Sequence, residues 1–167
     1  DRELKDRFLK NIVSLDDVCS YCLTEPGSGS DAAALKTKAA ITNEGYSLNG
    51  SKSFISGGGF SDLYVVLCRT GDQTPNGISM VLVENGQKGL SFGKKEQKMG
   101  WKAQPTAIVQ FDNCSIPAAN LVGEEGAGFK YAMEGLDGGR LNIAAASLGG
   151  AQKAYDCLLY TSDAADD

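Results

Sequence analysis

Hydrophobic residues recur every three to four positions near the start of the chain and give way to a shorter alternation soon afterwards. The apolar positions at this helical spacing are Leu4, Phe8, Ile12 and Val13. Because charged residues stand between them, the pattern predicts the last turns of an amphipathic helix over residues 1–13. Downstream, short apolar runs alternate with glycine-rich turns. The chain is therefore expected to start within a helix and to continue into a sheet.

The strand-like runs are short and are separated by turn residues rather than by helices. They cover residues 38–42, 46–48, 63–69, 78–83 and 106–111. The first two runs predict a hairpin in which Gly45 supplies a positive φ, and the last run is expected to stop at Asp112-Asn113. Since no ten-residue helical pattern lies between the runs, they favour an antiparallel sandwich or barrel over a doubly wound parallel sheet.

The pattern becomes helical again after Pro117. A short helix is expected over residues 126–136, because Glu124 and Glu125 precede it and suit the positive end of a helix dipole. A second helical region is expected from about Arg140, where small and apolar residues recur at helical spacing. These residues are Leu141, Ala144, Ala145, Leu148 and Ala151.

The last eleven residues, 157–167, interrupt this apolar stripe. They resemble the translation of a sequencing-library adaptor, so we expect a tail that is not native; a genuine acidic terminus is the alternative. The expected fold class is α+β, a mainly antiparallel β-sandwich or barrel-like middle domain between the end of one helical domain and the start of another. The expected boundaries are 1–17 for the first helical part, 18–122 for the β-domain, 123–156 for the second helical part and 157–167 for the tail.

Composition and charge exclude several classes of protein. The chain of 167 residues contains no histidine, and its 16 Lys and Arg against 21 Asp and Glu give a net charge of −5. Serine hydrolases with a His-containing triad, Cys-His proteases and HExxH zinc enzymes are therefore excluded. A pI near 4.8 argues against nucleic acid as a partner. No apolar run approaches the roughly 18 residues of a membrane span, so we expect a soluble protein without a membrane partner.

The five cysteines do not predict a metal site. Cys19 and Cys22 form a CxxC pair, but no second pair and no histidine complete a zinc site. Tyr21 and Leu23 alternate with them in a strand-like run. We therefore expect the cysteines to be small buried hydrophobes in a reducing compartment and expect no metal.

The most specific segment is an extended run that enters Gly27-Ser28-Gly29-Ser30. Without Cβ atoms at the glycines, backbone amides can approach an anion. Thr24, Ser28 and Ser30 add hydroxyl donors. This combination is typical of a cradle for a nucleotide phosphate or a flavin, and a plain turn is the alternative.

The order of residue types over 22–31 resembles the first signature of the acyl-CoA dehydrogenases: a small residue, an aliphatic residue, Thr, Glu, two residues, a small residue, Gly, Ser and Asp. The resemblance covers about residues 1–156 and implies a flavoenzyme with an N-terminal helical domain, a middle β-domain and a C-terminal helical domain that forms a tetramer. The chain would then be a fragment centred on the middle domain. Other matching segments are residues 48–52, 54–57, 89–92, 98–101 and 117–129.

The resemblance implies FAD as the cofactor, with Thr24 near the flavin ring and Ser30 near both the pyrophosphate and the CoA thioester. Residues 54–56 match a second flavin segment, in which many relatives have Trp and Thr where this chain has Phe54 and Ser56. An aromatic face and a hydroxyl are retained, and a strand end packed in the core is the alternative. The implied cofactor-binding residues are Tyr21, Cys22, Leu23, Thr24, Glu25, Pro26, Gly27, Ser28, Gly29, Ser30, Phe54, Ile55 and Ser56.

Residues 137–140 match the segment in which relatives contact acyl-CoA. Paired glycines allow close approach, and Arg140 can pair with an anionic or carbonyl oxygen. A helix–helix turn capped by Asp137 is the alternative. The implied substrate-binding residues are Ser30, Asp137, Gly138, Gly139 and Arg140. Together with residues 54–56 and 104–106, the Gly138-Gly139-Arg140 segment most resembles the isobutyryl-CoA branch of the family.

The implied reaction is α,β-desaturation of a short branched-chain acyl-CoA. A carboxylate removes the α-proton while hydride leaves the β-carbon for the flavin. The family's base is a glutamate far along the C-terminal domain, so no catalytic residue is expected in this chain. Glu25 matches a scaffold carboxylate. The family's interface arginine that meets FAD falls near Ala165.

The resemblance also implies partners and a location. These are an acyl-CoA substrate, an electron-transfer flavoprotein as acceptor, and a homotetramer when the protein is complete. The location would be the mitochondrial matrix in a eukaryote or the cytoplasm in a bacterium. The alternatives are an acyl-CoA oxidase, which returns electrons to oxygen, and a non-catalytic β-domain that binds a nucleotide or a partner.

Overall fold

The computed structural model describes residues 2–163 and divides the chain into two units, Asp1–Tyr131 and Ala132–Asp167. The predicted N-terminal helix is present as α1 (Arg2–Leu4), the π-helical turn η1 (Lys5–Leu9) and α2 (Lys10–Ser14). Leu4 packs with Leu63 and Leu82 of the sheet, and Phe8 and Ile12 lie against the same cluster. The apolar face that the sequence predicts thus covers part of the sheet.

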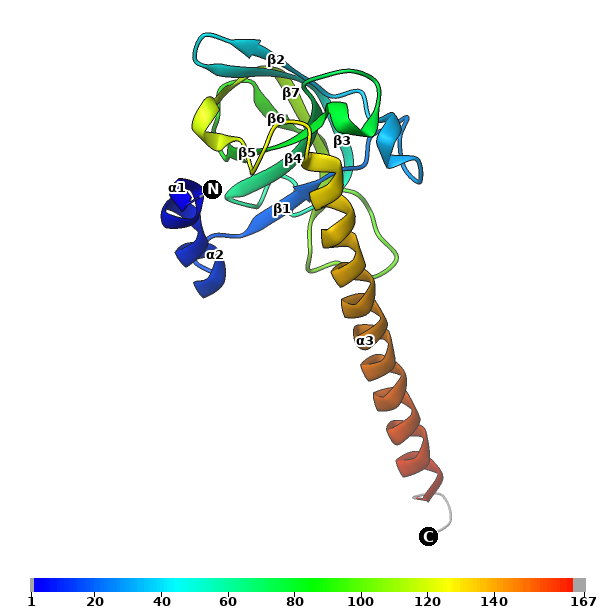
Figure 1. The fold of residues 1–167 in the computed structure, drawn as a ribbon. Coiled ribbons are helices and arrows are strands. Elements are labelled where there is room, and N and C mark those ends of the chain that lie inside the picture. The colour runs from blue at the N-terminus through cyan, green and yellow to red at the C-terminus, as the bar shows by residue number, and fades with distance from the viewer. Residues whose placement is uncertain (1, 164–167) are drawn as a thin grey trace. The chain divides into compact units, whose positions relative to one another are not determined.

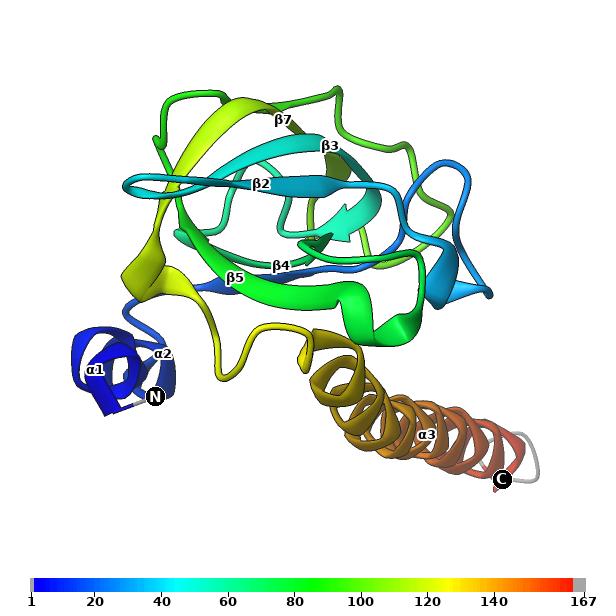
Figure 2. The same ribbon diagram turned by 45° about the horizontal axis from the view of Figure 1, so that its top comes forward.

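Seven strands form one curled sheet (Figures 1 and 2). Their order is β1-β4-β2-β3-β7-β6, and β5 pairs with β4. The short 3-10 turns η2 (Ala32–Ala34), η3 (Pro75–Gly77) and η4 (Ala118–Asn120) lie between strands or after the last one. The strands are β1 (Cys19–Cys22), β2 (Lys38–Thr42), β3 (Gly45–Ser56), β4 (Leu63–Arg69), β5 (Ile78–Glu84), β6 (Leu90–Phe92) and β7 (Thr106–Pro117).

The sheet confirms the predicted α+β class and its mainly antiparallel character. The pairs β2–β3, β3–β7, β4–β5 and β6–β7 are antiparallel. Strand β1 pairs with β4 in parallel over four residues, and β2 meets β4 in parallel at a single residue pair. The β2–β3 hairpin lies between β1 and β4 in sequence, so β4 runs in the same direction as β1. The curled sheet has the form of a half-barrel, which is visible in Figure 2.

The expected end of a strand at Asp112-Asn113 is wrong, since β7 continues to Pro117. Asn113 takes a left-handed φ of 47° within the strand. Its backbone N–H donates to Asn49 Oδ1 at 2.8 Å, and the register with β3 shifts between Leu48 and Gly50. The turn-forming residues therefore make a bulge rather than a strand end.

The expected division into two helices is also wrong. A single helix, α3, runs over Gly128–Asp163. The alternative of a helix–helix turn capped by Asp137 fails with it, because Asp137 pairs with Arg140 one turn later on the same helix. Each glycine costs an exposed helix about 1 kcal/mol but does not remove a backbone hydrogen bond as proline would. Paired glycines therefore weaken a helix without ending it.

Residues 157–163 belong to α3, so the loss of the apolar stripe does not end the helix. Residues 164–167, including Ala165, lie outside the described residues. The proposed origin of the tail stays a prediction.

The β-unit has one main core between its strands. It contains Leu48, Tyr64, Val66, Val81, Val109 and Ile116, all at most 1% exposed. Cys22, Cys68 and Cys114 are buried as predicted, whereas Cys19 and Cys157 are exposed. Cys19 is exposed because it alternates with the inward-facing Ser20 on β1. None of the helices described over residues 2–163 has the length and apolar character to cross a bilayer.

Candidate functional site

Strand β1 and the end of β3 bring the two predicted flavin segments together. The Ser53 backbone N–H donates to the Thr24 carbonyl oxygen at 2.8 Å. The Ser20 hydroxyl donates to the Ser56 carbonyl oxygen at 2.6 Å. Residues about 30 apart in sequence thus lie side by side, as the resemblance implies for one site.

The alternation along β1 decides which side chains of the first segment reach the surface. Cys22 and Leu23 are buried in the unit, at 0% and 8% exposure, while Tyr21 is 38% exposed. Thr24 is half-buried at the point where the strand becomes the loop. A ligand at this edge would meet Thr24 and backbone atoms rather than the side chains of Cys22 and Leu23.

The loop that follows is closed on itself. Glu25 and Ser28 exchange backbone hydrogen bonds of 2.9 and 3.2 Å. The Ser28 hydroxyl donates to the Asp31 carbonyl oxygen at 2.6 Å. The expectation that Ser28 offers a hydroxyl donor to an anion is therefore wrong, because its one hydroxyl proton is used inside the loop.

Other donors of the loop remain available. Among the residues that the structure describes, no partner is found for the hydroxyls of Thr24 and Ser30 or for the backbone N–H groups of Gly29 and Ser30. A Cβ at Gly27 or Gly29 would meet no atom within 4 Å. The space beside these glycines is thus not filled by the chain's own packing.

A buried ion pair underlies the same loop. Lys52 Nζ lies 2.7 Å from Glu25 Oε1 and donates to the Leu23 carbonyl oxygen at 3.0 Å. The backbone N–H groups of Lys36 and Thr37 donate to the two Glu25 oxygens at 2.7 and 2.9 Å. The Lys52 and Glu25 side chains are 0% and 7% exposed.

The surroundings keep Glu25 ionised. Burial would raise the pKa of its carboxyl, but the Lys52 ammonium and the amide donors hold that pKa below its ordinary value. Burial lowers the pKa of Lys52, and the neighbouring Glu25 carboxylate partly offsets this effect. The sequence analysis did not identify Lys52 as part of the site. The available signal was its position four residues after Leu48 on the same strand, because residues an even number apart on a strand face the same side.

The second segment contains a strained aromatic residue. Phe54 has φ 57° and is 68% exposed, in a register irregularity of β3 between Lys52 and Ile55. Ile55 is buried at 2% exposure. Only Ile55 therefore fits the alternative of a core strand end, whereas Phe54 presents its ring on the surface. A bulky residue with positive φ is costly and occurs often at functional sites.

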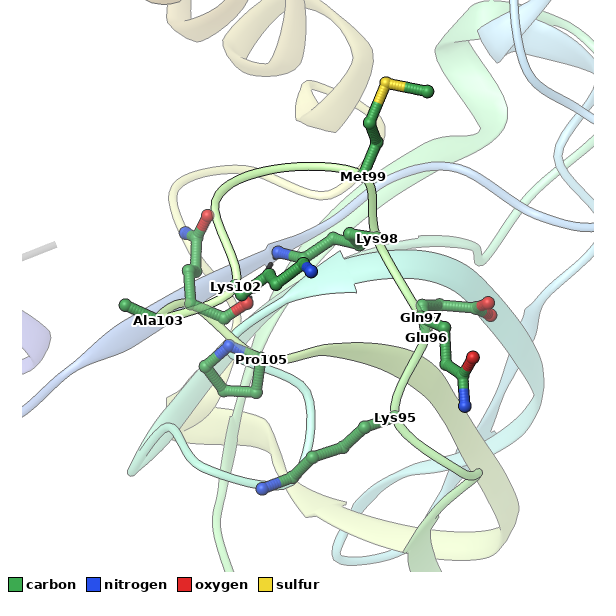
Figure 3. Close-up of a pocket in the computed structure, with 9 residues that line it drawn as sticks. Lys95, Glu96, Gln97, Lys98, Met99, Lys102, Ala103 and Pro105 are labelled. Atoms are coloured by element: carbon green, nitrogen blue, oxygen red, sulfur yellow. Dashed lines mark hydrogen bonds between the residues drawn. The ribbon is translucent and has the colours of Figure 1, made fainter.

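The loop between β6 and β7 adjoins this segment, because the Gly57 N–H donates to the Pro105 carbonyl oxygen at 2.8 Å. Within it lies a hollow of about 680 Å³ (Figure 3). Met99, which lines the hollow, and Trp101, two residues further along the loop, are both strongly exposed. The lining residues are Lys95, Glu96, Gln97, Lys98, Met99, Lys102, Ala103, Gln104 and Pro105.

The predicted substrate-binding residues 137–140 lie within α3, in the second unit. The side chains of Asp137 and Arg140 are 74% and 71% exposed and form an ion pair. A Cβ at Gly138 or Gly139 would meet no atom within 4 Å. The two glycines are therefore not required by contacts within the described chain.

Comparison with known proteins identifies the family and the fold of the chain. Residues 20–114 match the family model described as "Acyl-CoA dehydrogenase, middle domain", and residues 126–165 match "Acyl-CoA dehydrogenase, C-terminal domain". The chain is 55% identical over 162 residues to "Isobutyryl-CoA dehydrogenase, mitochondrial" of Dictyostelium discoideum, which covers 96% of this chain and 38% of that protein. The chain thus spans less than two-fifths of this relative.

Solved structures show the same fold. Butyryl-CoA dehydrogenase from Megasphaera elsdenii superposes with a TM-score of 0.84 at 41% identity, over 87% of this chain and 38% of that one. The structure titled "FAD complex of PigA" superposes with a TM-score of 0.75 at 32% identity, over 78% of this chain and 34% of that one. With more than half of its residues matched by the middle-domain model, the chain belongs to the acyl-CoA dehydrogenase family.

Proposed function

We propose that residues 21–30 and 54–56 hold FAD in an acyl-CoA dehydrogenase that desaturates a short branched-chain acyl-CoA, such as isobutyryl-CoA. One observation carries this proposal. The hydrogen bond from Ser53 N–H to the Thr24 carbonyl ties the first segment that the family resemblance assigns to the flavin to the residue directly before the second. The 55% identity to an isobutyryl-CoA dehydrogenase supports the acyl group.

The residues present fit the chemistry of FAD, which combines an anionic pyrophosphate with a flat aromatic ring. The backbone N–H groups of Gly29 and Ser30 and the Ser30 hydroxyl suit the pyrophosphate. The hydroxyls of Thr24 and Ser56 and the exposed ring of Phe54 suit the flavin. Open space beside Gly27 and Gly29 leaves room for a ligand.

Bound FAD would supply the hydride acceptor of the reaction. The chain's own part is to bind and orient: Thr24 and Ser56 would donate to flavin atoms, and Phe54 would cover the ring from water. Arg140 and the glycines before it would contact the acyl-CoA, together with Ser30. We assign no acid–base role to Glu25, because it is buried and paired with Lys52. The base would lie in the part of the whole protein that this chain does not span.

The whole protein would act with the partners of its family. We propose an acyl-CoA substrate, an electron-transfer flavoprotein as electron acceptor and a homotetrameric assembly. The location would be the mitochondrial matrix for a eukaryotic gene, as the name of the Dictyostelium relative indicates for that protein, or the cytoplasm for a bacterial one.

FAD titration tests the binding site. Flavin fluorescence should show saturable but weak binding to the chain, weak because other parts of the whole protein would complete the site. Thr24→Val and Ser56→Ala should each weaken binding about two- to tenfold, the loss of one hydrogen bond. Thr42→Val, an exposed position on β2, is the matched control and should bind as the unaltered chain does. The absence of saturable binding would contradict the proposal.

A further inference from the structure

Three consecutive residues of the first flavin segment are each tied to the same stretch of β3. Lys52 Nζ donates to the Leu23 carbonyl oxygen at 3.0 Å and to Glu25 Oε1 at 2.7 Å. The Ser53 N–H donates to the Thr24 carbonyl oxygen between them at 2.8 Å. Lys52 therefore bonds to the residues on both sides of Thr24, and Ser53 bonds to Thr24 itself.

This arrangement restricts Thr24 more than one hydrogen bond would. A single bond to the Thr24 carbonyl fixes its distance from β3 but leaves the flanking peptide groups free to rotate. With the Leu23 carbonyl and the Glu25 carboxylate held by one buried ammonium, the residues on both sides of Thr24 are also tied to β3. The backbone of Thr24, whose hydroxyl has no partner in the described part of the chain, is thereby held in place relative to β3.

Stability alone is a weak reason for such a pair. Two charged groups removed from water lose solvation that their mutual attraction often only just repays, and an apolar pair of similar volume is frequently as stable. Lys52 also cannot contact a ligand, because its side chain is fully buried and both bonds are made inside the protein. A role in orienting the loop that begins at Thr24 would explain why position 52 carries a charged side chain.

We propose that Lys52 is a positioning residue that, through Leu23 and Glu25, fixes the Thr24 hydroxyl toward the flavin ring. The proposal rests on the function proposed above. Lys52 lies outside both predicted flavin segments, yet it would set the geometry of the part of the site that holds the flavin ring. The pyrophosphate part, at Gly29 and Ser30, lies beyond the closed Glu25–Ser28 turn, so we expect it to depend less on Lys52.

The test uses a double variant, because Lys52→Met alone would leave Glu25 buried without its counter-charge and could prevent folding. Glu25→Gln combined with Lys52→Met removes both charges together with the grip on Leu23. We expect this variant to fold, with its thermal melting midpoint close to that of the unaltered chain. FAD affinity should fall by about tenfold, which corresponds to about 1.4 kcal/mol. Lys38→Met, an exposed lysine on β2, is the matched control and should leave FAD affinity unchanged.

A competition with ADP separates positioning from general loosening. ADP has the pyrophosphate and adenosine of FAD but lacks the flavin ring, so its affinity should change by less than about twofold in the double variant. Equal losses for FAD and ADP would show that Lys52 is only a structural support and would overturn the inference. Unchanged FAD affinity in the folded double variant would also overturn it.

A second variant keeps the inference falsifiable if the double variant does not fold. Glu25→Gln alone retains Lys52 and its bond to Leu23, and Lys52 can lose its proton because burial already lowers its pKa, so we expect this variant to fold. We expect a smaller loss of FAD affinity than in the double variant, again without loss of ADP affinity. No loss in this folded variant would overturn the inference. Failure of the unaltered chain to bind FAD at all would instead overturn the proposed function, which separates the two outcomes.

Discussion

Glu25 keeps a negative charge inside the protein because donors surround its carboxylate. Lys52 Nζ and the backbone amides of Lys36 and Thr37 all lie within 3.0 Å of its oxygens. These groups favour the ionised form by more than burial disfavours it, so the pKa of Glu25 lies below its ordinary value of 4.5. The bonds from Lys36 and Thr37 also hold the end of the η2–β2 connection against the first predicted flavin segment. At the scale of single residues, the site thus depends on charge as well as on apolar packing.

The lowered pKa of Glu25 predicts the response of stability to acid. Above pH 4.5 the carboxyl is ionised in both folded and unfolded chains, and its full contribution to stability is present. As the pH falls from about 4.5 through the lower folded-state pKa, the unfolded chain binds the proton first and stability is lost. Urea unfolding between pH 6 and about 3 should show a shallower acid loss for Glu25→Gln, and identical slopes would contradict this account.

The turn after β3 joins several elements of the site. Gly57 has φ 82°, and a Cβ there would collide with the hydroxyls of Ser61 and Ser20. The Ser20 hydroxyl in turn donates to the Ser56 carbonyl oxygen. The packing of β1 against the end of β3 therefore requires glycine at this position.

Gly57→Ala should destabilise the protein more than a matched glycine substitution does. Gly86 has nearly the same φ, 83°, but a Cβ there would meet no atom within 4 Å. Gly86→Ala should thus lower the free energy of unfolding by only about 1–2 kcal/mol, the cost of a left-handed backbone at a residue with a Cβ. Gly57→Ala should cost about 1–3 kcal/mol more through overpacking. Urea unfolding of both variants measures the difference, and equal losses would show that Ser20 and Ser61 move aside freely.

Local sequence patterns predicted some elements well. Strand β4 has the predicted bounds, and the hairpin at Gly45 is present because its turn residues and flanking strands are neighbours in sequence. The bulge at Asn113 was predicted as a strand end, because the same turn-forming residue types occur at strand ends and in bulges. In the bulge, the Asn113 N–H donates to the Asn49 side chain, which is 64 positions away in sequence.

The structure brings together the two segments that the sequence predicts for the flavin. The Gly-Ser pattern over residues 27–30 and the resemblance indicated both of these segments, and their role in binding flavin stays a prediction. The roles of Lys52 and Ser20 could not be found in this way, because each acts on a residue about 30 positions away and the pairing of β1 with the end of β3 decides which residues meet. The hydroxyl of Ser28 was misjudged because its acceptor is a backbone carbonyl, which sequence does not reveal.

At the scale of the whole molecule, this chain should bind flavin without reducing it. Removal of an α-proton needs a positioned base, typically worth about 10²–10⁴ in rate. The carboxylate within the first segment, Glu25, is buried and paired. Under anaerobic isobutyryl-CoA, the absorbance of FAD bound to the chain should therefore not bleach at an enzyme-like rate. Rapid bleaching would contradict this expectation and would make Glu25 the carboxylate to replace next.

The most direct test of the proposed site is amide hydrogen exchange of the chain with and without saturating FAD. The N–H groups of Gly29 and Ser30 have no partner in the described part of the chain and should exchange quickly without ligand. With FAD, exchange should slow in peptides covering residues 23–30 and 53–57, while the turn over residues 85–89 stays unchanged. Slowed exchange elsewhere, with both flavin segments unaffected, would contradict the account.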